Sequence, residues 1–462
     1  MQRRVLFVFS IYHYYREMLP VAEYYHRQGY QVHVLIGFRG ATASEACDKC
    51  KAIHINVHWV PSELGYGDHL AADSQRGKDR SVNSRRSLLR SIGVFLSLLR
   101  KDMAIQRFAD SLISSIVPDM VFGGPYHSCG EIDNGIAKVV RRRGVPYCCL
   151  PVSPYVGERQ AVFARFNNLA VGMISPEIEA NRSGVHRCLA RFFPEWTRTR
   201  DNRQAFMFDP LAMAASRVTG LLPANPWQKP SEDYDVVFVE SEFSRKLLLE
   251  SKYDCERIIV AGKPLLDKIF DNLKDKTHGA EVRRKLDLDV DEPFILCNVE
   301  PSAEHRYSSW EDHWDRFARL MESLKATGWK IVLSLHPLCD PDKYKFVEQK
   351  YDFRLALDYK MAELYPHCSV AVSFPCSTNV LASVFNKPLV IYDFFGLTDQ
   401  AAPQSGLYRL PGALFAYGTQ ELVDRLREAL CGLQPGRGCT AEREDRSACK
   451  SIYWHVQQRF GV

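Results

Sequence analysis

The stretch that decides the fold lies at the start of the chain, where residues 4–37 read RVLFVFSIYHYYREMLPVAEYYHRQGYQVHVLIG. Its first six residues form a short apolar run, which is typical of a buried strand. Residues 18–30 show the apolar spacing of a helix that stops at Gly29, and the apolar run QVHVLIG follows at once. The order strand, helix, strand predicts a βαβ unit with two parallel strands.

The same alternation recurs along the rest of the chain. It is seen in SLISSIVPDMVFGG (111–124), GEIDNGIAKVVRRRGVPYCCLPV (130–152), YDVVFVESEFSRKLLLESKYDCERIIVAGKP (234–264), PFILCNVE (293–300), GWKIVLSLHP (328–337), CSVAVSF (368–374) and KPLVIYDF (387–394). This pattern predicts an α/β protein with two Rossmann-like lobes, each built on a parallel sheet. Ligands of such sheets bind beyond the carboxyl ends of the strands.

A polar, charged stretch at 273–291 separates the two series of strands, and we place the lobe boundary there. The predicted parts are an N-terminal lobe at 1–272, a linker at 273–291, a C-terminal lobe at 292–445 and a terminal helix at 446–462. Residues 151–230 are irregular and helical in pattern, so we expect an elaboration of the first lobe. The alternative boundary, in the Pro-rich stretch 221–234, would separate a βαβ unit from its lobe.

Composition excludes several classes of function. The chain has 462 residues, of which 46% are hydrophobic and 25% charged, as in ordinary globular proteins. A net charge of +5 is too small for this length to indicate a nucleic-acid-binding protein. With no secretory signal and no run of about 18 apolar residues, we expect a cytoplasmic protein. Its 14 cysteines are then reduced thiols, and the lone Cys47–Cys50 pair lacks a second pair of zinc ligands.

Two loops of the second lobe carry residues that suit a phosphate. His336 and Pro337 follow the strand KIVLSL, and Ser377, Thr378 and Asn379 follow the strand SVAV. If the serine and threonine begin a helix, their hydroxyls and the backbone amides of its first turn can bind an anion. His336 can donate a hydrogen bond to the same phosphate. Alternatively, one of these hydroxyls only caps the helix and binds no ligand.

A third loop follows the first strand of the same lobe. It contains Glu300, Glu304, His305 and Arg306, which the sheet edge would bring near the other two loops. The alternative is a solvated charged loop. We include Glu304, His305 and Arg306 among the predicted nucleotide- and phosphate-binding residues.

In layout the chain resembles the GT-B superfamily of nucleotide-sugar enzymes. The passage VESEFSRKLLL followed by RIIVAGKPLLD is similar to the close of the first lobe in UDP-N-acetylglucosamine 2-epimerase-like members. LHP followed by CST and NKPLVIYD resembles CDP-glycerol glycerophosphotransferase and the bacterial sialyl- and Kdo-transferases. In those families these groups hold the phosphate of a cytidine nucleotide. The resemblance implies two lobes facing a deep cleft, a nucleotide-activated sugar as substrate and no further cofactor.

Departures from the family patterns narrow the expectation. The epimerase signatures are replaced by CCLPVSPYVGERQ and SFPCSTNVLAS, which disfavours epimerisation. In many UDP-dependent transferases a glutamate near the position of Leu381 binds the ribose hydroxyls. The leucine here therefore favours a CMP- or CDP-linked donor over a UDP-linked one. Of the Asp-x-Asp matches, 287–291 lies in the predicted linker and Asp340 opens a turn, so we predict a metal-independent enzyme.

The first lobe offers several candidates for a general base. His13 lies in the loop after the first strand, where the resemblance places a catalytic histidine, and Tyr14 is the alternative if the alignment shifts by one residue. His127 follows another strand, with Glu131 and Asp133 as orienting groups or bases themselves. We predict His13, His127 and Glu131 as catalytic residues.

A basic, apolar stretch at 76–102 carries eight Lys and Arg against two Asp, a net charge of +6. Its helical spacing fits a helix on an anionic membrane or one that receives a lipid-linked acceptor. A core-facing helix with a solvated basic edge is the alternative.

The sequence therefore predicts a cytoplasmic glycosyltransferase in surface polysaccharide biosynthesis. The protein would be either free in the cytoplasm or peripheral on the inner face of the membrane. It would transfer a sugar from a CMP-, CDP- or UDP-linked donor to a glycan or lipid-linked acceptor. The alternatives are a nucleotide-sugar 2-epimerase or hydrolase and a non-catalytic nucleotide-sugar-binding protein.

Overall fold

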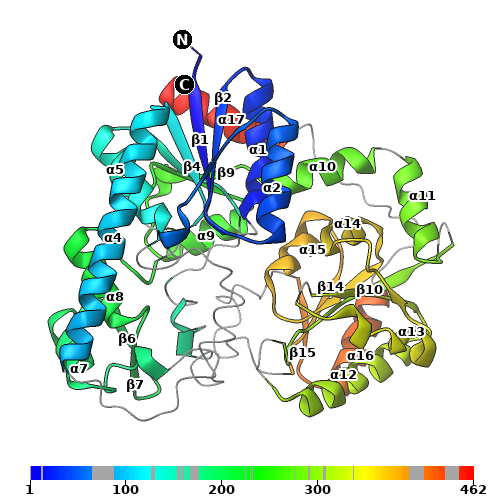
Figure 1. The fold of residues 1–462 in the computed structure, drawn as a ribbon. Helices are drawn as coiled ribbons and strands as arrows, with labels where there is room; N and C mark the ends of the chain where they lie inside the picture. The colour runs from blue at the N-terminus through cyan, green and yellow to red at the C-terminus, as the bar shows by residue number, and fades with distance from the viewer. Residues whose placement is uncertain are drawn as a thin grey trace. The chain divides into compact units, whose positions relative to one another are not determined.

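The computed structural model describes most of the chain. The described ranges are 2–11, 14–64, 88–125, 131–152, 158, 161–163, 165–166, 176–223, 225–228, 230, 233–274, 276–289, 292–304, 308–336, 338–394, 410, 412–431 and 447–462. The chain forms two compact units (Figure 1). Unit 1 comprises Met1–Phe166, Ser175–Asp267 and Arg446–Val462, and unit 2 comprises Lys268–Asp445.

Unit 1 is built on a parallel seven-stranded sheet with the order β3-β2-β1-β4-β5-β8-β9. Its strands are β1 (Arg4–Phe9), β2 (Gln31–Ile36), β3 (Asn56–Trp59), β4 (Met120–Gly123), β5 (Tyr147–Cys149), β8 (Val236–Val239) and β9 (Ile258–Val260). Its main helices are α1 (Tyr14–Arg27), α2 (Ala41–Ala52), α4 (Leu88–Ile116), α5 (Ile132–Arg143), α9 (Glu242–Glu250) and α17 (Ala448–Phe460). The strand order reverses between β1 and β4, which is where ligands of such sheets bind.

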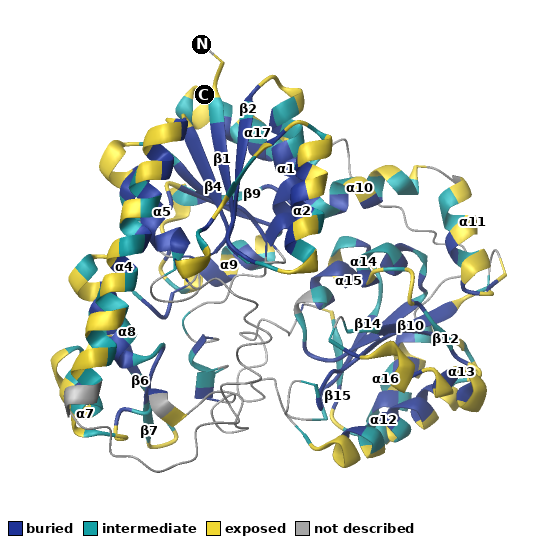
Figure 2. Ribbon diagram, in the orientation of Figure 1, coloured by how far each residue is buried: buried dark blue, intermediate teal, exposed yellow. Residues whose placement is uncertain are grey.

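The alternation of side chains along β1 explains why both faces of this sheet are covered. Val5 and Phe7 pack with α1, α2 and the terminal helix α17, whereas Leu6 and Val8 pack with α4 and α5. All four side chains are fully buried, as Figure 2 shows for the strands as a whole. A strand apolar on both faces is the signature of a parallel sheet sandwiched between helices.

The elaboration of unit 1 has its own core and contains a β-hairpin in addition to the irregular, helical pattern expected. It contains α7 (Gly184–Phe192), β6 (Thr197–Arg200), β7 (Arg203–Phe206) and α8 (Pro210–Thr219). The antiparallel β6–β7 hairpin turns through Asp201 and Asn202, whose φ angles are 50° and 61°. Asp and Asn tolerate this left-handed conformation, which a tight hairpin turn requires.

Unit 2 is built on a parallel six-stranded sheet with the order β12-β11-β10-β13-β14-β15. Its strands are β10 (Phe294–Val299), β11 (Lys330–Leu335), β12 (Arg354–Leu355), β13 (Val370–Ser373), β14 (Leu389–Tyr392) and β15 (Leu414–Ala416). Its helices are α11 (Lys276–Lys285), α12 (Trp310–Lys325), α13 (Phe346–Tyr351), α14 (Met361–Leu364), α15 (Val380–Val384) and α16 (Thr419–Cys431). Here the order reverses between β10 and β13.

The stretch expected as a linker, 273–291, holds helix α11 rather than extended chain. Arg283 of α11 donates to the backbone oxygen of Glu292 (2.7 Å) and to that of His367 (3.2 Å), which fastens the helix to unit 2. The division between the units falls earlier, within α10 (Pro264–Leu273) after Asp267. Asp267 accepts hydrogen bonds from the backbone amides of Ala448 and Cys449, so it caps the terminal helix α17.

Gly124 is required by a close approach of two chain segments. A Cβ atom at this position would overlap the ring of Tyr14, which is fully buried and donates to the backbone oxygen of Pro125 (3.1 Å). We expect Gly124→Ala to lower the free energy of unfolding by about 1–3 kcal/mol through overpacking. Chemical denaturation measures this. Gly93→Ala, in α4 with open space around it, should instead stabilise by about 0.5–1 kcal/mol, and equal effects would contradict the close approach.

A histidine pair in unit 1, in which His33 is buried and His58 is partly exposed, predicts a pH dependence of stability. His33 Nδ1 lies 2.9 Å from His58 Nε2, and burial, followed by the His58 charge, lowers the pKa of His33 to about 4. Between pH 6.5 and 4 the unfolded chain therefore binds a proton that the native state does not, so stability falls as pH falls. We expect His33→Gln to flatten this slope, by about 1–3 kcal/mol over the window, in denaturation curves recorded from pH 7 to 4. An unchanged slope would contradict the assignment.

Candidate functional site

The carboxyl edge of the unit 2 sheet is organised around Asn298, the penultimate residue of β10. Its side-chain amide donates to Ser373 Oγ, Cys376 Sγ and Thr378 Oγ1, each at 3.4 Å. Its backbone oxygen accepts from the Tyr392 hydroxyl at 2.9 Å. One buried amide thus joins the ends of β10, β13 and β14 at the reversal of strand order.

The loop after β13 begins its helix differently from the expectation. Cys376 occupies the cap position, residues 377–379 form a 3₁₀ turn, and α15 follows. The Thr378 hydroxyl lies 2.9 Å from Cys376 Sγ, and Asn379 donates through Nδ2 to the backbone oxygen of Phe374 (3.0 Å). Asn379 is fully buried and stabilises the loop through this hydrogen bond. Thr378 is partly exposed. The side chain of Ser377 lies outside the described residues.

His336 stands directly after β11 and its ring is oriented by its own loop. The backbone amide of Leu338 donates to His336 Nδ1 (3.2 Å), and that of Cys339 donates to the His336 backbone oxygen (2.8 Å). Because Nδ1 accepts, the neutral imidazole carries its proton on Nε2. The side chain is partly exposed, so the ring presents an N–H donor at the sheet edge. Pro337 lies outside the described residues.

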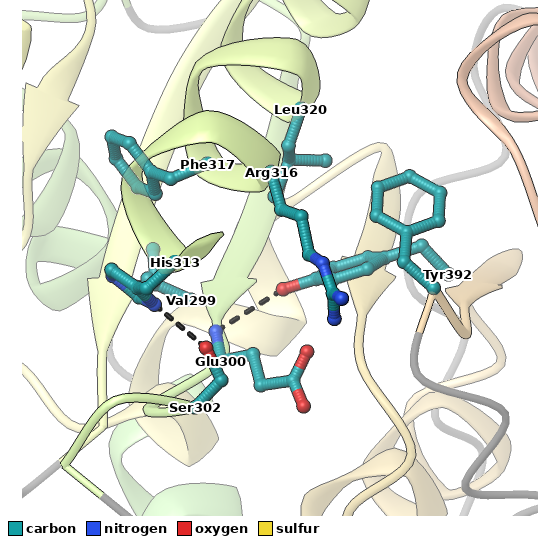
Figure 3. A pocket seen from close by; sticks show the side chains of 9 residues that line it. Val299, Glu300, Ser302, His313, Arg316, Phe317, Leu320 and Tyr392 are labelled. Carbon is teal, nitrogen blue, oxygen red and sulfur yellow. Dashed lines mark hydrogen bonds between the residues drawn. The ribbon is translucent and has the colours of Figure 1, made fainter. Parts of the chain in front are cut away.

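A chain of hydrogen bonds runs through the loop after β10. Tyr344 donates its only hydroxyl proton to Glu304 Oε1 (3.1 Å) and therefore accepts from His313 Nε2 (2.9 Å). His313 Nδ1 must then accept from Ser302 Oγ (2.7 Å), the bond drawn in Figure 3. Burial lowers the pKa of His313, which keeps the ring neutral as this chain requires. The hydrogen bonds therefore run in one direction, from Ser302 through His313 and Tyr344 to the predicted site residue Glu304.

A hollow lies beside this chain, at the ends of β10 and β14 (Figure 3). Its lining residues are Val299, Glu300, Ser302, His313, Arg316, Phe317, Leu320, Tyr392 and Phe394. Burial, followed by the nearby Asp393 charge, raises the pKa of Glu300 well above its usual range, while Arg316 acts in the opposite direction. The hollow therefore presents a cation, a carboxyl that favours its neutral form and a hydroxyl against an aliphatic and aromatic wall.

The hydroxyls of two buried tyrosines, Tyr14 and Tyr234, lie at the carboxyl edge of the unit 1 sheet. Tyr14 begins α1 and Tyr234 precedes β8; their hydroxyls donate to the backbone oxygens of Pro125 and Gly124. Both rings are buried, and burial raises both pKa values well above the usual range. These hydroxyls hold the start of the loop that leads to His127. Neither His127 nor His13 is among the described residues, and the same is true of His305 and Arg306.

Two carboxyls lie at the start of α5, close to the reversal of strand order in unit 1. Glu131 is the cap residue of the helix and is partly exposed. Asp133 is fully buried, and burial, followed by the Glu131 charge, raises its pKa to about 8. A carboxyl with a pKa near neutrality can take up or release a proton under ordinary conditions. Only Glu131 is exposed enough to meet a ligand directly.

Several residues of the unit 2 site were not predicted from the sequence. Asn298, Ser302 and His313 belong to it through contacts between segments far apart in the chain. The one local signal is Asn298 itself, a polar residue inside the apolar run FILCNV. Among the described residues no group of His, Cys, Asp or Glu is placed to hold a metal ion.

The Tyr344 hydroxyl is predicted to stabilise unit 2. Tyr344→Phe would leave His313 Nε2 without its partner and would remove one hydrogen bond of Glu304, so we expect the free energy of unfolding to fall by about 1–3 kcal/mol. The matched control is Tyr365→Phe, because the buried Tyr365 hydroxyl has no hydrogen-bond partner among the described residues. Removing it should be neutral or stabilising. Equal losses in urea denaturation would show that the chain of hydrogen bonds is not stabilising.

Comparison with solved structures identifies the fold. No protein-family model and no curated protein sequence matches the chain. A putative UDP-N-acetylglucosamine 2-epimerase from Listeria monocytogenes is similar with a TM-score of 0.53 and 10% identity, over 100% of this chain and 97% of the other. The calicheamicin glycosyltransferase CalG4 is similar with a TM-score of 0.53 and 14% identity, over 99% of both chains. The UDP-GlcNAc 2-epimerase from Neisseria meningitidis, solved bound to UDP-GlcNAc, is similar with a TM-score of 0.51 and 12% identity, over 99% of this chain and 100% of the other. At this identity the likeness concerns the fold. The chain has the two-unit α/β fold known as GT-B, which it shares with these epimerases and this glycosyltransferase.

Proposed function

We propose that the chain is a glycosyltransferase that moves a sugar from a nucleotide-activated donor to a glycan or lipid-linked acceptor. The observation that carries this proposal is the polar edge of unit 2. The Asn298-centred loop and the Nε2–H donor of His336 stand on either side of β10, next to the reversal of strand order. This is where a doubly wound sheet binds a nucleotide phosphate.

The described groups suit the departure of a nucleotide. Negative charge builds up on the phosphate oxygen as the bond to the sugar breaks. A hydrogen bond from His336 Nε2–H would stabilise that charge without any change in the protonation of the ring, whose proton is already on this nitrogen. The hydroxyl of Thr378, fixed by Cys376 and Asn298, would orient the same phosphate. Neither group depends on a metal ion in this scheme.

The acceptor would bind at the carboxyl edge of the unit 1 sheet. Its attacking hydroxyl must lose a proton, and the candidates are His13, His127 and Glu131, with Asp133 as a buried neighbour whose pKa is raised to about 8. General-base catalysis of this kind contributes about 10²–10⁴-fold to a rate. Glu131, partly exposed at the start of α5, is the candidate that the described residues support.

The donor base is proposed from the sequence of α15. Leu381 is buried in unit 2, so the chain has no carboxylate there to hold ribose hydroxyls. We infer a CMP- or CDP-linked donor in preference to a UDP-linked one. The two epimerases described above are named for UDP-linked N-acetylglucosamine, and UDP therefore belongs in every test.

Epimerisation is the second candidate function, because the fold is shared with UDP-GlcNAc 2-epimerases as well as with a glycosyltransferase. Two carboxyl groups whose pKa values are raised by burial support it, namely Asp133 and Glu300. A protein that binds a nucleotide sugar without turning it over is the third. Surface polysaccharide biosynthesis in the cytoplasm is the setting we infer for the transferase.

The experiment that separates these functions follows the donor with and without acceptor. The full-length protein is incubated without metal with CMP-, CDP- and UDP-sugars, and nucleotide release is measured by chromatography and sugar configuration by NMR. Nucleotide release that requires an acceptor supports the transferase. Conversion or release without an acceptor supports the epimerase or hydrolase, and a shift in the melting temperature without turnover supports the binding protein.

His336 provides the site-directed prediction. We expect His336→Ala to weaken nucleotide binding by about 10–100-fold, because a hydrogen bond to a charged phosphate is lost. His336→Gln retains an N–H donor near Nε2 and should lose much less. Isothermal titration with CMP, CDP and UDP measures both. Wild-type affinity in the alanine variant would remove His336 from the phosphate site.

A further inference from the structure

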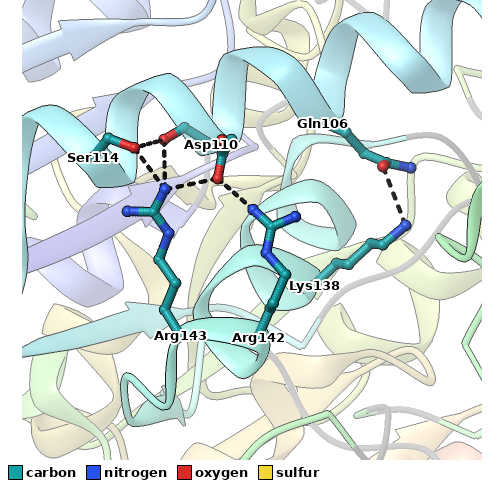
Figure 4. Close-up of polar contacts among 6 residues, drawn as sticks. All are labelled: Gln106, Asp110, Ser114, Lys138, Arg142 and Arg143. Carbon is teal, nitrogen blue, oxygen red and sulfur yellow. Dashed lines mark hydrogen bonds and ion pairs between the residues drawn. The ribbon is translucent and has the colours of Figure 1, made fainter.

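Helix α4 is firmly docked along its C-terminal half. Ile105, Ala109 and Ile113 are buried against the unit 1 sheet and α5. Asp110 pairs with Arg142 and Arg143 from the end of α5, the latter at 2.7 Å, and Lys138 donates to Gln106 Oε1 at 3.1 Å (Figure 4). These contacts fix the position of the whole helix on unit 1.

The N-terminal half of the same helix is apolar but is not buried. Between Ser91 and Lys101 no described side chain is buried, although the sequence SIGVFLSLLRK is rich in large aliphatic and aromatic residues. Ile92 is 46% exposed and Leu96 is 45% exposed, and Met103, the residue directly after Asp102, is 43% exposed. The alternative considered from the sequence, a core-facing helix at 76–102, is not supported by the described residues 91–101, because the buried side chains of α4 begin at Asp102.

The exposed apolar residues share one face of the helix with two arginines. At about 100° per residue, Ile92, Leu96 and Met103 fall within a narrow stripe, and Arg100 and Arg107 lie on the same side. Both arginines are exposed. Within the described part of the chain neither forms an ion pair, in contrast to Arg142 and Arg143. We call these five residues the apolar-basic face of α4.

The chemistry of this face favours an anionic lipid surface over a protein partner. Aliphatic side chains enter the boundary between headgroups and acyl chains, and arginines on the same face bind lipid phosphates. The sequence preceding the helix adds to the positive charge, since residues 76–87 carry five Lys and Arg against one Asp, a net charge of +4. Among the described residues no helix is long and apolar enough to cross a bilayer, so the contact would be one of docking on its surface.

We propose that the apolar-basic face of α4 docks unit 1 on an anionic lipid surface. The docked half of α4 supplies the rigid support, and the exposed half supplies the contact. This inference does not depend on the proposed function, because it rests on a face of unit 1 distant in sequence from every residue of the candidate site in unit 2. For a transferase with a lipid-linked acceptor it would bring the enzyme to its substrate.

The test measures binding of the full-length protein to vesicles by co-sedimentation. Wild type should bind vesicles of phosphatidylcholine with 30 mol% phosphatidylglycerol and should bind pure phosphatidylcholine much less. Arg100→Glu/Arg107→Glu should weaken binding by about 30-fold or more, roughly fivefold for each arginine removed. Ile92→Ser/Leu96→Ser should weaken binding to a similar degree, because less apolar area enters the membrane.

A charge-matched control separates this face from net charge. Lys246→Glu/Arg284→Glu makes the same change in net charge at two exposed positions on α9 and α11, and it should bind like wild type. If the control loses binding equally, or if wild type does not bind anionic vesicles, the proposal is overturned. Concentration-dependent dimerisation that Ile92→Ser/Leu96→Ser abolishes, without vesicle binding, would assign the face to a second copy of the chain and also overturn it. Circular dichroism confirms that each variant is folded.

Discussion

The side-chain amide of Asn298 is the constraint on which the edge of unit 2 depends. It is buried at the end of β10, where an unsatisfied polar group would cost about 1–3 kcal/mol. Its donors are satisfied only if the loop after β13 closes over it with Ser373, Cys376 and Thr378. The backbone oxygen of the same residue receives the Tyr392 hydroxyl from β14. The loops of three strands are therefore positioned by one residue, and the partly exposed Thr378 hydroxyl is oriented as a result.

The sequence is informative where the determinants are local. Apolar runs and helix stops are properties of contiguous residues, so the two parallel sheets follow from them, as does the placing of His336 at a strand end. The Asp340 turn is equally local, and Asp340 caps the short 3₁₀ helix that follows it. The family resemblance adds the expectation of two lobes, which the structural comparisons confirm as the GT-B fold.

The sequence is uninformative where a role depends on pairing across the chain. His313 lies in the middle of an amphipathic helix and reads as a surface or core residue, yet it links Ser302 to Tyr344. The β6–β7 hairpin was missed because its strands are short and rich in arginine, and only the Asp201–Asn202 turn marks it. The chain enters α15 through a 3₁₀ turn whose cap residue is Cys376, and Asn379 is the cap residue of α15 itself; tertiary contacts with Asn298 hold this arrangement rather than capping preference.

Burial disfavours the charged form of ionisable groups in both units, and the neighbouring charges decide whether that shift in pKa is reversed. Burial alone lowers the pKa of Lys263, but the Glu17 carboxylate at 3.1 Å and the nearby Glu240 more than compensate, so the pKa is raised and the ammonium stays charged. Burial raises the pKa of Asp133 and of Glu300, and the charges of Glu131 and Asp393 add to these shifts; Arg316 offsets the shift of Glu300 only in part. In both cases the shift favours the neutral form, and it brings the pKa of Asp133 to about 8. Since both lie close to the point where the strand order of their sheet reverses, these protons are held where a parallel sheet binds its ligand.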